Sequence, residues 1–375
     1  MIPYARQSMS YRDIFAVVKS LRRDLLTTGP LVEKLENELA TTVGTPTVVV
    51  SSGTAALHAA YSAIDLRPGD EIITSPMTFV ATHATAALFG AKIVFADINR
   101  RTGNIDPASA ESLISHRTKA IVGIDYAGQP IELDELKRIT EKNSIYLVED
   151  AAHSLGSEYK QKKVGSIADI TTFSFFATKN ITSGEGGAIA SNDSRLLSRA
   201  RSFSRQGMIR NRSDFRITDQ GNWHQEVHEF GLNYRLPDIL CALGISQLRR
   251  LNEFKVKRNL LRDIYIHALS NISGLEFLEK LSESDPVWHL FPIFVPKDAR
   301  SQIFDDLAKS GIRTQVNYIP TYWHPVFQDL GYKRGLCPNA EDFYLHELSL
   351  PFYVGLTPRK QQKVIKTIKS LALIR

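Results

Sequence analysis

The sequence predicts an α/β protein: a large domain built on a mostly parallel sheet, followed by a smaller α+β domain. Three observations favour this class. The chain has 375 residues, which suits two domains of unequal size better than one small core. Strand-like and helix-like segments alternate over roughly its first 200 residues. The strand-like segments are apolar throughout, as expected for strands that helices cover on both faces.

Each predicted element of the first half has a local reason. The strands are short apolar or β-branched runs bounded by turn residues, and we place them at 46–52, 71–75, 91–98, 118–128 and 144–150. The helices between them are alanine-rich or apolar at helical spacing, and we place them at 53–64, 80–90 and 131–142. Pro-Gly marks a turn at 67–70, and Gly90 ends a helix.

The pattern changes in the second half of the chain. Residues 235–270 suit one long helix or two in tandem, with Pro237 where a first helical turn tolerates it. After them we expect strands at 287–295 and 312–319, a helix at 298–311, and a last helix from about 357. We therefore place the large domain at 12–250 and the small domain at 251–375.

Composition excludes several classes of protein. The net charge of +6 is scattered and lacks interleaved aromatic residues, so we expect no nucleic-acid partner. The most apolar long window, 77–98, contains His83 and Lys92 and is split at Gly90, so we expect no membrane span. The chain starts without a signal-like apolar segment, and its two cysteines lie far apart without metal-site spacing. We expect a reduced, cytoplasmic protein without a metal site.

A lysine stands beside a glycine-rich turn in the stretch FSFFATKNITSGEGG, residues 173–187. The apolar run before it is typical of a buried strand, which places Lys179 near the end of that strand. One interpretation is a surface lysine at a hairpin corner, the usual environment of this residue. The other is a lysine held in a pocket, where a lowered pKa lets its amine form a Schiff base.

Two further stretches carry polar residues at the ends of predicted strands, where open α/β sheets bind ligands. In SSGTA (51–55), Gly53 would let the backbone N–H groups of a helix start approach a phosphate, or the stretch is an ordinary helix cap. In EDAAH (149–153), Asp150 either caps a helix or meets a cation such as a pyridinium nitrogen. His153 either shares that ligand or is a structural histidine.

A serine and an aromatic ring complete the set of candidates. Ser174 could donate a hydrogen bond to a phosphate or to the backbone. Phe79, after the strand at 71–75, could stack on a flat ring or pack in the core. Together the candidates describe a phosphate cradle, a stacking ring, an acid for a pyridine nitrogen and a Schiff-base lysine. That combination predicts a pyridoxal phosphate site.

The same stretches make the sequence resemble the sugar-nucleotide aminotransferases of the fold type I pyridoxal phosphate superfamily. The motifs that carry the resemblance cover nearly the whole chain and lie at 51–58, 67–84, 148–159, 173–187 and 231–248. Within the family, the chain is most similar to the branch that serves pseudaminic acid synthesis, on softer motifs at 118–130, 153–165, 311–322 and 340–351. The resemblance implies a large α/β/α domain, a small C-terminal α+β domain and a homodimer.

The resemblance also implies a role for each matching residue. Lys179 would carry pyridoxal 5′-phosphate covalently and then move protons, Asp150 would pair with the pyridine nitrogen, and His153 would sit by the ring hydroxyl. The other cofactor contacts would be Phe79 on the ring, then Gly53, Thr54, Ala55 and Ser174 on the phosphate, and Asn233 on the phosphate of the neighbouring subunit. The nucleotide sugar would meet the N-terminal segment 1–11 at Tyr4, and also Asp24, Leu25, Leu26, Thr27, Asn317, Tyr318, Ile319, Pro320, Thr321 and Tyr322.

The reaction implied is transfer of an amino group from L-glutamate to a UDP-linked 4-keto-6-deoxy-N-acetylhexosamine. The alternatives are a D-configured UDP sugar, a GDP- or dTDP-linked keto sugar, and a non-catalytic relative, against which the intact lysine and aspartate argue. Some relatives are cofactor-dependent dehydratases with a histidine in place of the lysine, so Lys179 argues against a dehydratase. Gln206 departs from the family, where a histidine is more usual, and the polar segment 209–230 suits a flexible loop near the site.

Overall fold

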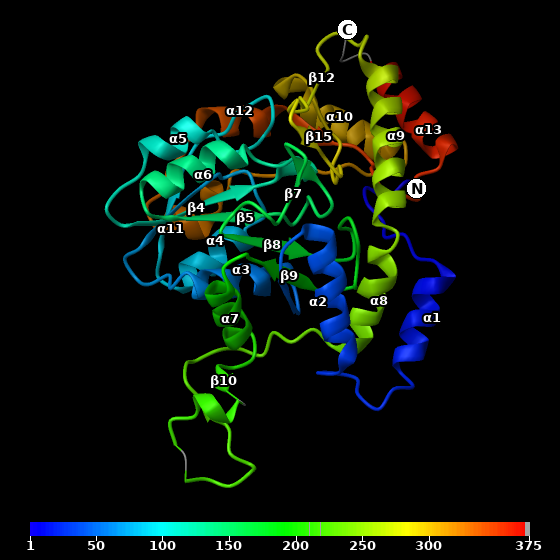
Figure 1. Ribbon diagram of the computed structural model, residues 1–375. Helices are drawn as coiled ribbons and strands as arrows, with labels where there is room; N and C mark the ends of the chain where they lie inside the picture. Colours follow the sequence, from blue (N-terminus) through cyan, green and yellow to red (C-terminus); the bar gives the residue numbers. More distant parts are fainter. Residues whose placement is uncertain (210, 218, 372–375) are drawn as a thin grey trace.

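The large domain is built on a sheet of seven strands in the order β1-β9-β8-β5-β4-β2-β3 (Figure 1). A computed structural model describes residues 1–209, 211–217 and 219–371. Strand β9 is antiparallel to both neighbours and the remaining pairs are parallel, which confirms the mostly parallel sheet. The strands are β1 (Thr47–Val50), β2 (Glu71–Thr74), β3 (Lys92–Phe95), β4 (Thr118–Ile124), β5 (Tyr146–Asp150), β8 (Ile170–Ser174) and β9 (Gly187–Ala190).

Helices cover both faces of this sheet because successive strand residues are buried on opposite sides. Val48 packs into the core of one face, whereas its neighbour Val49 packs with Leu35 on the other. The first face carries α3 (Gly53–Ala63), α4 (Ala81–Leu88) and α7 (Ser194–Phe203). The second carries α2 (Pro30–Val43), α5 (Pro107–Ser112), α6 (Leu133–Lys142) and α8 (Asp238–Leu248). The predicted α/β/α layering is confirmed.

The helical stretch 235–270 is two helices in tandem, α8 and α9 (Leu251–Leu269), and the predicted small domain covers the segment from α9 onward. Its elements are α9, α10 (Lys297–Lys309), α11 (Pro325–Asp329), α12 (Pro338–His346), α13 (Pro358–Ser370) and an antiparallel sheet of β12 (Glu276–Phe277), β14 (Pro292–Phe294) and β15 (Glu347–Ser349). Strand β13 (Ser284–Asp285) pairs with the hairpin β6 (Glu158–Tyr159) and β7 (Lys162–Lys163). Near the N-terminus, α1 (Tyr11–Ser20) lies along α8 (Figure 1). Across the residues described, none of the helices is both long and apolar enough to cross a bilayer.

Some predicted strands differ from the structure, and that at 287–295 is reduced to β14. Residues 312–319 form only isolated bridges, from Ile312 to Ile2 and from Gln315 to Ser349. The reason is that the backbone of Asn317 bonds to side chains: its N–H donates to Glu347 at 2.7 Å, and its carbonyl accepts from Tyr126. In the apolar run 173–177 the strand ends at Ser174, so Lys179 lies on a turn after the strand.

A hairpin of β10 (Met208–Ile209) and β11 (Glu226–Val227) projects from the body below α7 (Figure 1). It belongs to the predicted flexible loop 209–230, of which residues 210 and 218 lie outside the described residues. The carboxylate of Glu226 accepts hydrogen bonds from the backbone N–H groups of Arg216 and Ile217 and contacts His224 and His228. These contacts fasten the two sides of the hairpin together.

Candidate active site

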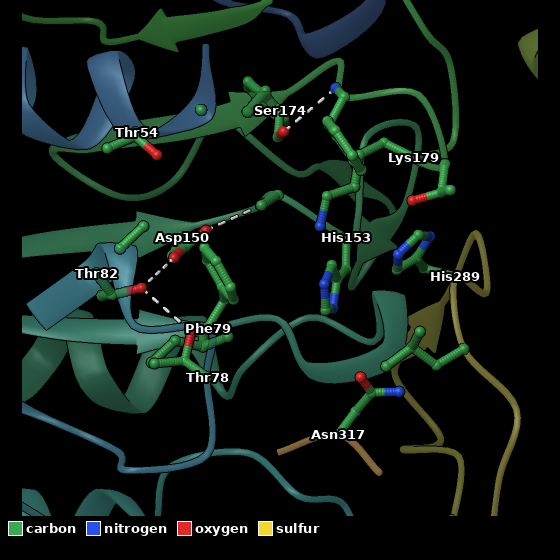
Figure 2. Close-up of a pocket in the computed structure, with 18 of the residues that line it drawn as sticks. Thr54, Thr78, Phe79, Thr82, Asp150, His153, Ser174, Lys179, His289 and Asn317 are labelled. Atoms are coloured by element: carbon green, nitrogen blue, oxygen red, sulfur yellow. Dashed lines mark hydrogen bonds between the residues drawn. The ribbon is translucent and has the colours of Figure 1, made fainter. Parts of the chain in front are cut away.

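A cavity of about 430 Å³ opens at the carboxyl ends of the parallel strands (Figure 2). Ile124 and Asp150 line it from the ends of β4 and β5, and Ser174 lines it from the end of β8. Gly53 and Thr82 line it from the first turns of α3 and α4. The sequence predicted a ligand-binding site at this edge of the sheet. The cavity is closed by residues of the N-terminal segment and the second half of the chain, which include Tyr4, His289, Gln315, Asn317, Tyr318 and Phe352.

Lys179 points into this cavity between Asp150 and His153 (Figure 2). Its backbone N–H donates to the carbonyl of Phe176 at 2.9 Å, which holds it on the turn after β8. Burial lowers the pKa of the Lys179 amine to about 8, and the negative charge of Asp150 opposes that shift. A lysine with this pKa is partly neutral near neutral pH and can act as a nucleophile. The surface-lysine interpretation does not describe its position.

Asp150 is 5% exposed and sits at the end of β5. Its Oδ2 accepts a hydrogen bond from the Thr82 hydroxyl at 2.7 Å, and its Oδ1 accepts one from the Ala152 N–H at 3.2 Å. Burial raises the pKa of this carboxyl, whereas the two hydrogen bonds and the charge of Lys179 act in the opposite direction. A buried carboxylate that lines a cavity is suited to hold a cationic N–H group.

The first turn of α3 forms the third part of the site. Amides of a first helical turn lack intrahelical acceptors and attract anions. A Cβ on Gly53 would stand 2.8 Å from the Ser174 Cβ, so only glycine lets the two elements approach this closely. Gly53, Thr54 and Ser174 line the cavity. Ala55 is buried, and its N–H donates to the Ser52 hydroxyl at 3.0 Å.

Two histidines lie beside Lys179 in the lining of the cavity (Figure 2). The rings of His153 and His289 lie with centroids 4.4 Å apart, and the His153 Nε2 is 3.2 Å from the Tyr318 hydroxyl. Burial lowers the pKa of both imidazoles well below the usual range, and the charge of Lys179 adds to the effect. Both rings are therefore neutral at neutral pH. His289 was not predicted from the sequence, where it is a single histidine inside an apolar run.

The cavity of a single chain gathers only part of the predicted cofactor and substrate contacts. Tyr4, Asn317 and Tyr318 line it, and Phe79 stands at its rim with 62% of its surface exposed. Tyr322 is fully buried, and its hydroxyl donates to Glu341 at 2.6 Å. Other predicted contacts also do not line the cavity: Asp24, Leu25, Leu26, Thr27, Asn233, Ile319, Pro320 and Thr321.

A pair of carboxyl groups lies directly behind Asp150, on the other face of the sheet. Glu149 and Asp125 are fully buried. The Thr171 hydroxyl donates to the Glu149 Oε2 at 2.8 Å, and the Ile131 N–H donates to the Asp125 Oδ1 at 3.0 Å. The Glu149 Oε1 has no hydrogen-bond donor among the described residues. A proton shared with the Asp125 carboxyl would supply this hydrogen bond. Burial raises the pKa of Glu149 to about 7, and burial and the Glu149 charge raise that of Asp125 well above its usual range.

We expect this pair to make stability fall as pH rises. Glu149 ionises in the unfolded chain near its usual pKa of about 4.3 but in the folded protein only near 7, so the folded state binds more protons between these values. Glu149→Gln keeps the hydrogen bond from Thr171 and removes one titrating group. Between pH 5 and pH 8, the free energy of unfolding of this variant should therefore decrease less than that of the wild type. The difference between the two decreases should reach roughly 3 kcal/mol. Urea unfolding across this range measures it, with Glu33→Gln at an exposed position of α2 as control; parallel profiles for wild type and Glu149→Gln would count against the shared proton.

Comparison with known proteins adds to this geometry. A model of the DegT/DnrJ/EryC1/StrS aminotransferase family matches residues 7–369. A relative from Campylobacter jejuni named UDP-4-amino-4,6-dideoxy-N-acetyl-beta-L-altrosamine transaminase is 36% identical over 99% of this chain and 97% of its own. The structure of Helicobacter pylori PseC, described as an aminotransferase involved in the biosynthesis of pseudoaminic acid, superposes with a TM-score of 0.92 at 34% identity, covering 98% of each chain. The PLP form of a putative sugar aminotransferase from Streptococcus pneumoniae superposes with a TM-score of 0.92 at 30% identity, again over 98% of each chain.

Proposed function

Since the chain belongs to the DegT/DnrJ/EryC1/StrS aminotransferase family, we propose that it transfers an amino group from L-glutamate to a UDP-linked 4-keto-6-deoxy-N-acetylhexosamine. The product would be UDP-4-amino-4,6-dideoxy-N-acetyl-β-L-altrosamine, the sugar in the name of the Campylobacter jejuni relative. The observation that carries the chemistry is the cavity in which the Lys179 amine, with its lowered pKa, faces the buried carboxylate of Asp150. The sugar itself is carried over from the relatives.

The cofactor is pyridoxal 5′-phosphate, and the residues of the cavity fit it. The first turn of α3 at Gly53 and Thr54 would hold the phosphate together with the Ser174 hydroxyl. Asp150 would hold the protonated pyridine nitrogen, which gives this carboxylate a cationic partner. His153 would sit by the ring hydroxyl and Phe79 against the ring. When bound, pyridoxal phosphate supplies an electron-accepting ring that stabilises the charge left when an amino acid loses its α-proton.

The protein's own residues would then supply orientation and proton transfer. The Lys179 Nζ would take the α-proton of the amino donor and return a proton to the acceptor carbon. The charge of Asp150 would keep the ring nitrogen protonated throughout. Tyr4 and Asn317 are held to each other by a hydrogen bond of 2.7 Å and would face the sugar nucleotide from the small-domain side. The cavity lining between these groups is mostly apolar, which limits water near the reacting carbon.

We propose further that the working unit is a homodimer in the cytoplasm. The exposed face of α1 and the segment after it carry large apolar side chains, which a second chain would cover: Tyr11, Ile14, Phe15, Val18, Leu21, Leu25 and Leu26. Phe230, which follows the hairpin of β10 and β11, is 98% exposed. Asn233 follows it and does not line the cavity of its own chain, as expected for a residue that serves the phosphate of the neighbouring subunit.

A half-reaction tests the substrate. The protein is converted to its pyridoxamine form with L-glutamate, the donor is removed, and the visible spectrum is followed while 4-keto UDP sugars of L-arabino and D-xylo configuration are added separately. We expect the absorbance of the pyridoxal form to return with the L-arabino compound alone. Return with the D-xylo compound alone would replace the proposed sugar by the D-configured one. Conversion by glutamate without return on either compound would retain the aminotransferase and reject both sugars.

A further inference from the structure

We infer that Thr82 is a positioning residue for this reaction: its hydroxyl keeps Asp150 ionised and turned toward the ring nitrogen of the cofactor. The inference rests on the proposed function, because it gives Asp150 the ring nitrogen as its partner. No role for Thr82 was predicted from the sequence, yet among the described residues it is the only one whose side chain hydrogen-bonds to Asp150. It lines the cavity from the first turn of α4 (Figure 2).

The direction of the hydrogen bonds follows from their chemistry. An ionised carboxylate only accepts, so the Thr82 hydroxyl must donate its single proton to the Asp150 Oδ2, at 2.7 Å. The Thr82 oxygen is then free to accept from the Thr78 hydroxyl, 3.1 Å away. Thr78 lies in the bend before α4 and Thr82 in the first turn of the helix, and this bend brings the two hydroxyls together. The result is a directed chain from Thr78 through Thr82 to Asp150.

The surroundings hold Thr82 in place. Its side chain is buried, and its backbone carbonyl accepts a hydrogen bond of 2.9 Å from the Tyr61 hydroxyl of the neighbouring helix α3. A threonine has one rotatable bond before its hydroxyl, so this fixed backbone leaves the Oγ1 little freedom. The hydroxyl is therefore presented to Asp150 before any ligand binds.

Asp150 needs such a donor because burial favours its neutral form. Three groups oppose burial: the Thr82 hydroxyl, the Ala152 N–H and the charge of Lys179. The charge of Lys179 is lost when its amine acts as a nucleophile, so the two neutral donors are then the groups of these three that still favour the ionised carboxylate. The other titratable groups that act on Asp150 or are acted on by it are Tyr61, Glu149 and Tyr318. None of these three carries a positive charge, so they offer Asp150 no compensation.

The test compares Thr82→Val, which keeps the shape and removes the donor, with Thr82→Ser, which keeps the donor. Each holoenzyme is loaded with cofactor labelled with ¹⁵N in the ring, and the ¹⁵N chemical shift reports whether the ring nitrogen is protonated. We expect the shift of Thr82→Val to move toward the unprotonated value and its turnover to fall about ten- to a hundredfold. Thr82→Ser should restore both readouts to near wild type.

A matched control is available in the same helix. Thr85 is buried like Thr82, but its hydroxyl donates to the Ala81 carbonyl at 2.7 Å and it does not line the cavity. Thr85→Val should leave the ¹⁵N shift unchanged, which separates the loss of any buried hydroxyl from the loss of this one. Should valine at position 82 prevent folding, Thr82→Ala removes the same donor without adding a methyl group in its place.

The outcomes separate this inference from the proposed function. A donor-less variant that binds one cofactor per chain with the wild-type ¹⁵N shift would overturn the role of Thr82 and leave the proposed function standing. Wild-type protein that binds no pyridoxal phosphate would overturn both. A shift that moves in Thr82→Val, stays in Thr85→Val and returns in Thr82→Ser would establish Thr82 as the residue that keeps Asp150 ionised.

Discussion

Lys179→Ala is expected to bind pyridoxal phosphate without a covalent link and to lose about four orders of magnitude in turnover. We propose this amine as the nucleophile, because burial lowers its pKa to about 8 and its side chain points between Asp150 and His153 (Figure 2). It is also the group proposed to move the α-proton. Borohydride reduction followed by peptide mass analysis measures the link: the wild type should carry the reduced cofactor on Lys179, and the variant on no lysine.

The control for this prediction is a lysine that does not line the cavity. Lys162 is exposed on the hairpin strand β7, so Lys162→Ala should retain both the link and the turnover. Added ethylamine should partly restore the rate of Lys179→Ala, because a free amine can replace the missing base, whereas it cannot repair a misfolded site. Turnover of Lys179→Ala within tenfold of the wild type would remove Lys179 from the proposed chemistry.

The sequence predicted those parts of the site that depend on the order of strands and helices. Asp150 and Ser174 end strands, and Gly53 begins a helix after one, so a mostly parallel sheet had to bring all three to one edge. Lys179 was placed near the same edge by the apolar run before it. The layering of the large domain followed from the same pattern, because strands that are apolar throughout require helices on both faces.

The parts that could not be predicted depend on contacts between distant segments. Residues 312–319 have the composition of a strand, yet Glu347 and Tyr126 bind the backbone of Asn317 and replace the ladder. Tyr322 belongs to a predicted substrate motif, but its side chain is buried and its hydroxyl donates a hydrogen bond to the Glu341 carboxylate. His289 reaches the cavity from the small domain, where no local pattern marks it. Thr82 lies within the motif at 67–84, but only the structure shows its hydroxyl against Asp150.

Asp150→Asn should reduce the rate of the glutamate half-reaction by about a hundred- to several-thousandfold. The amide has the shape of the carboxylate but no charge, so it cannot hold the ring nitrogen in its protonated form. Removing one partner of a buried ion pair costs about 3–5 kcal/mol, and each 1.4 kcal/mol corresponds to tenfold in rate. Cofactor binding should persist, because the phosphate cradle proposed at Gly53 and the amine of Lys179 are untouched. Single-turnover absorbance after mixing with L-glutamate measures the rate, with Asp298→Asn on the exposed start of α10 as control.

Combining this variant with Thr82→Val tests whether the two residues act as one unit. If Thr82 works only by keeping Asp150 ionised, its hydroxyl has little left to do once position 150 carries a neutral amide. The double variant should then be about as slow as Asp150→Asn alone, within roughly threefold, although Thr82→Val alone costs ten- to a hundredfold. Rates that multiply instead would mean that Thr82 contributes by a route independent of Asp150. A near-normal rate for Asp150→Asn itself would show that the electron-accepting ring does not depend on this carboxylate, and the charge that keeps the ring nitrogen protonated would have to come from another residue of the cavity.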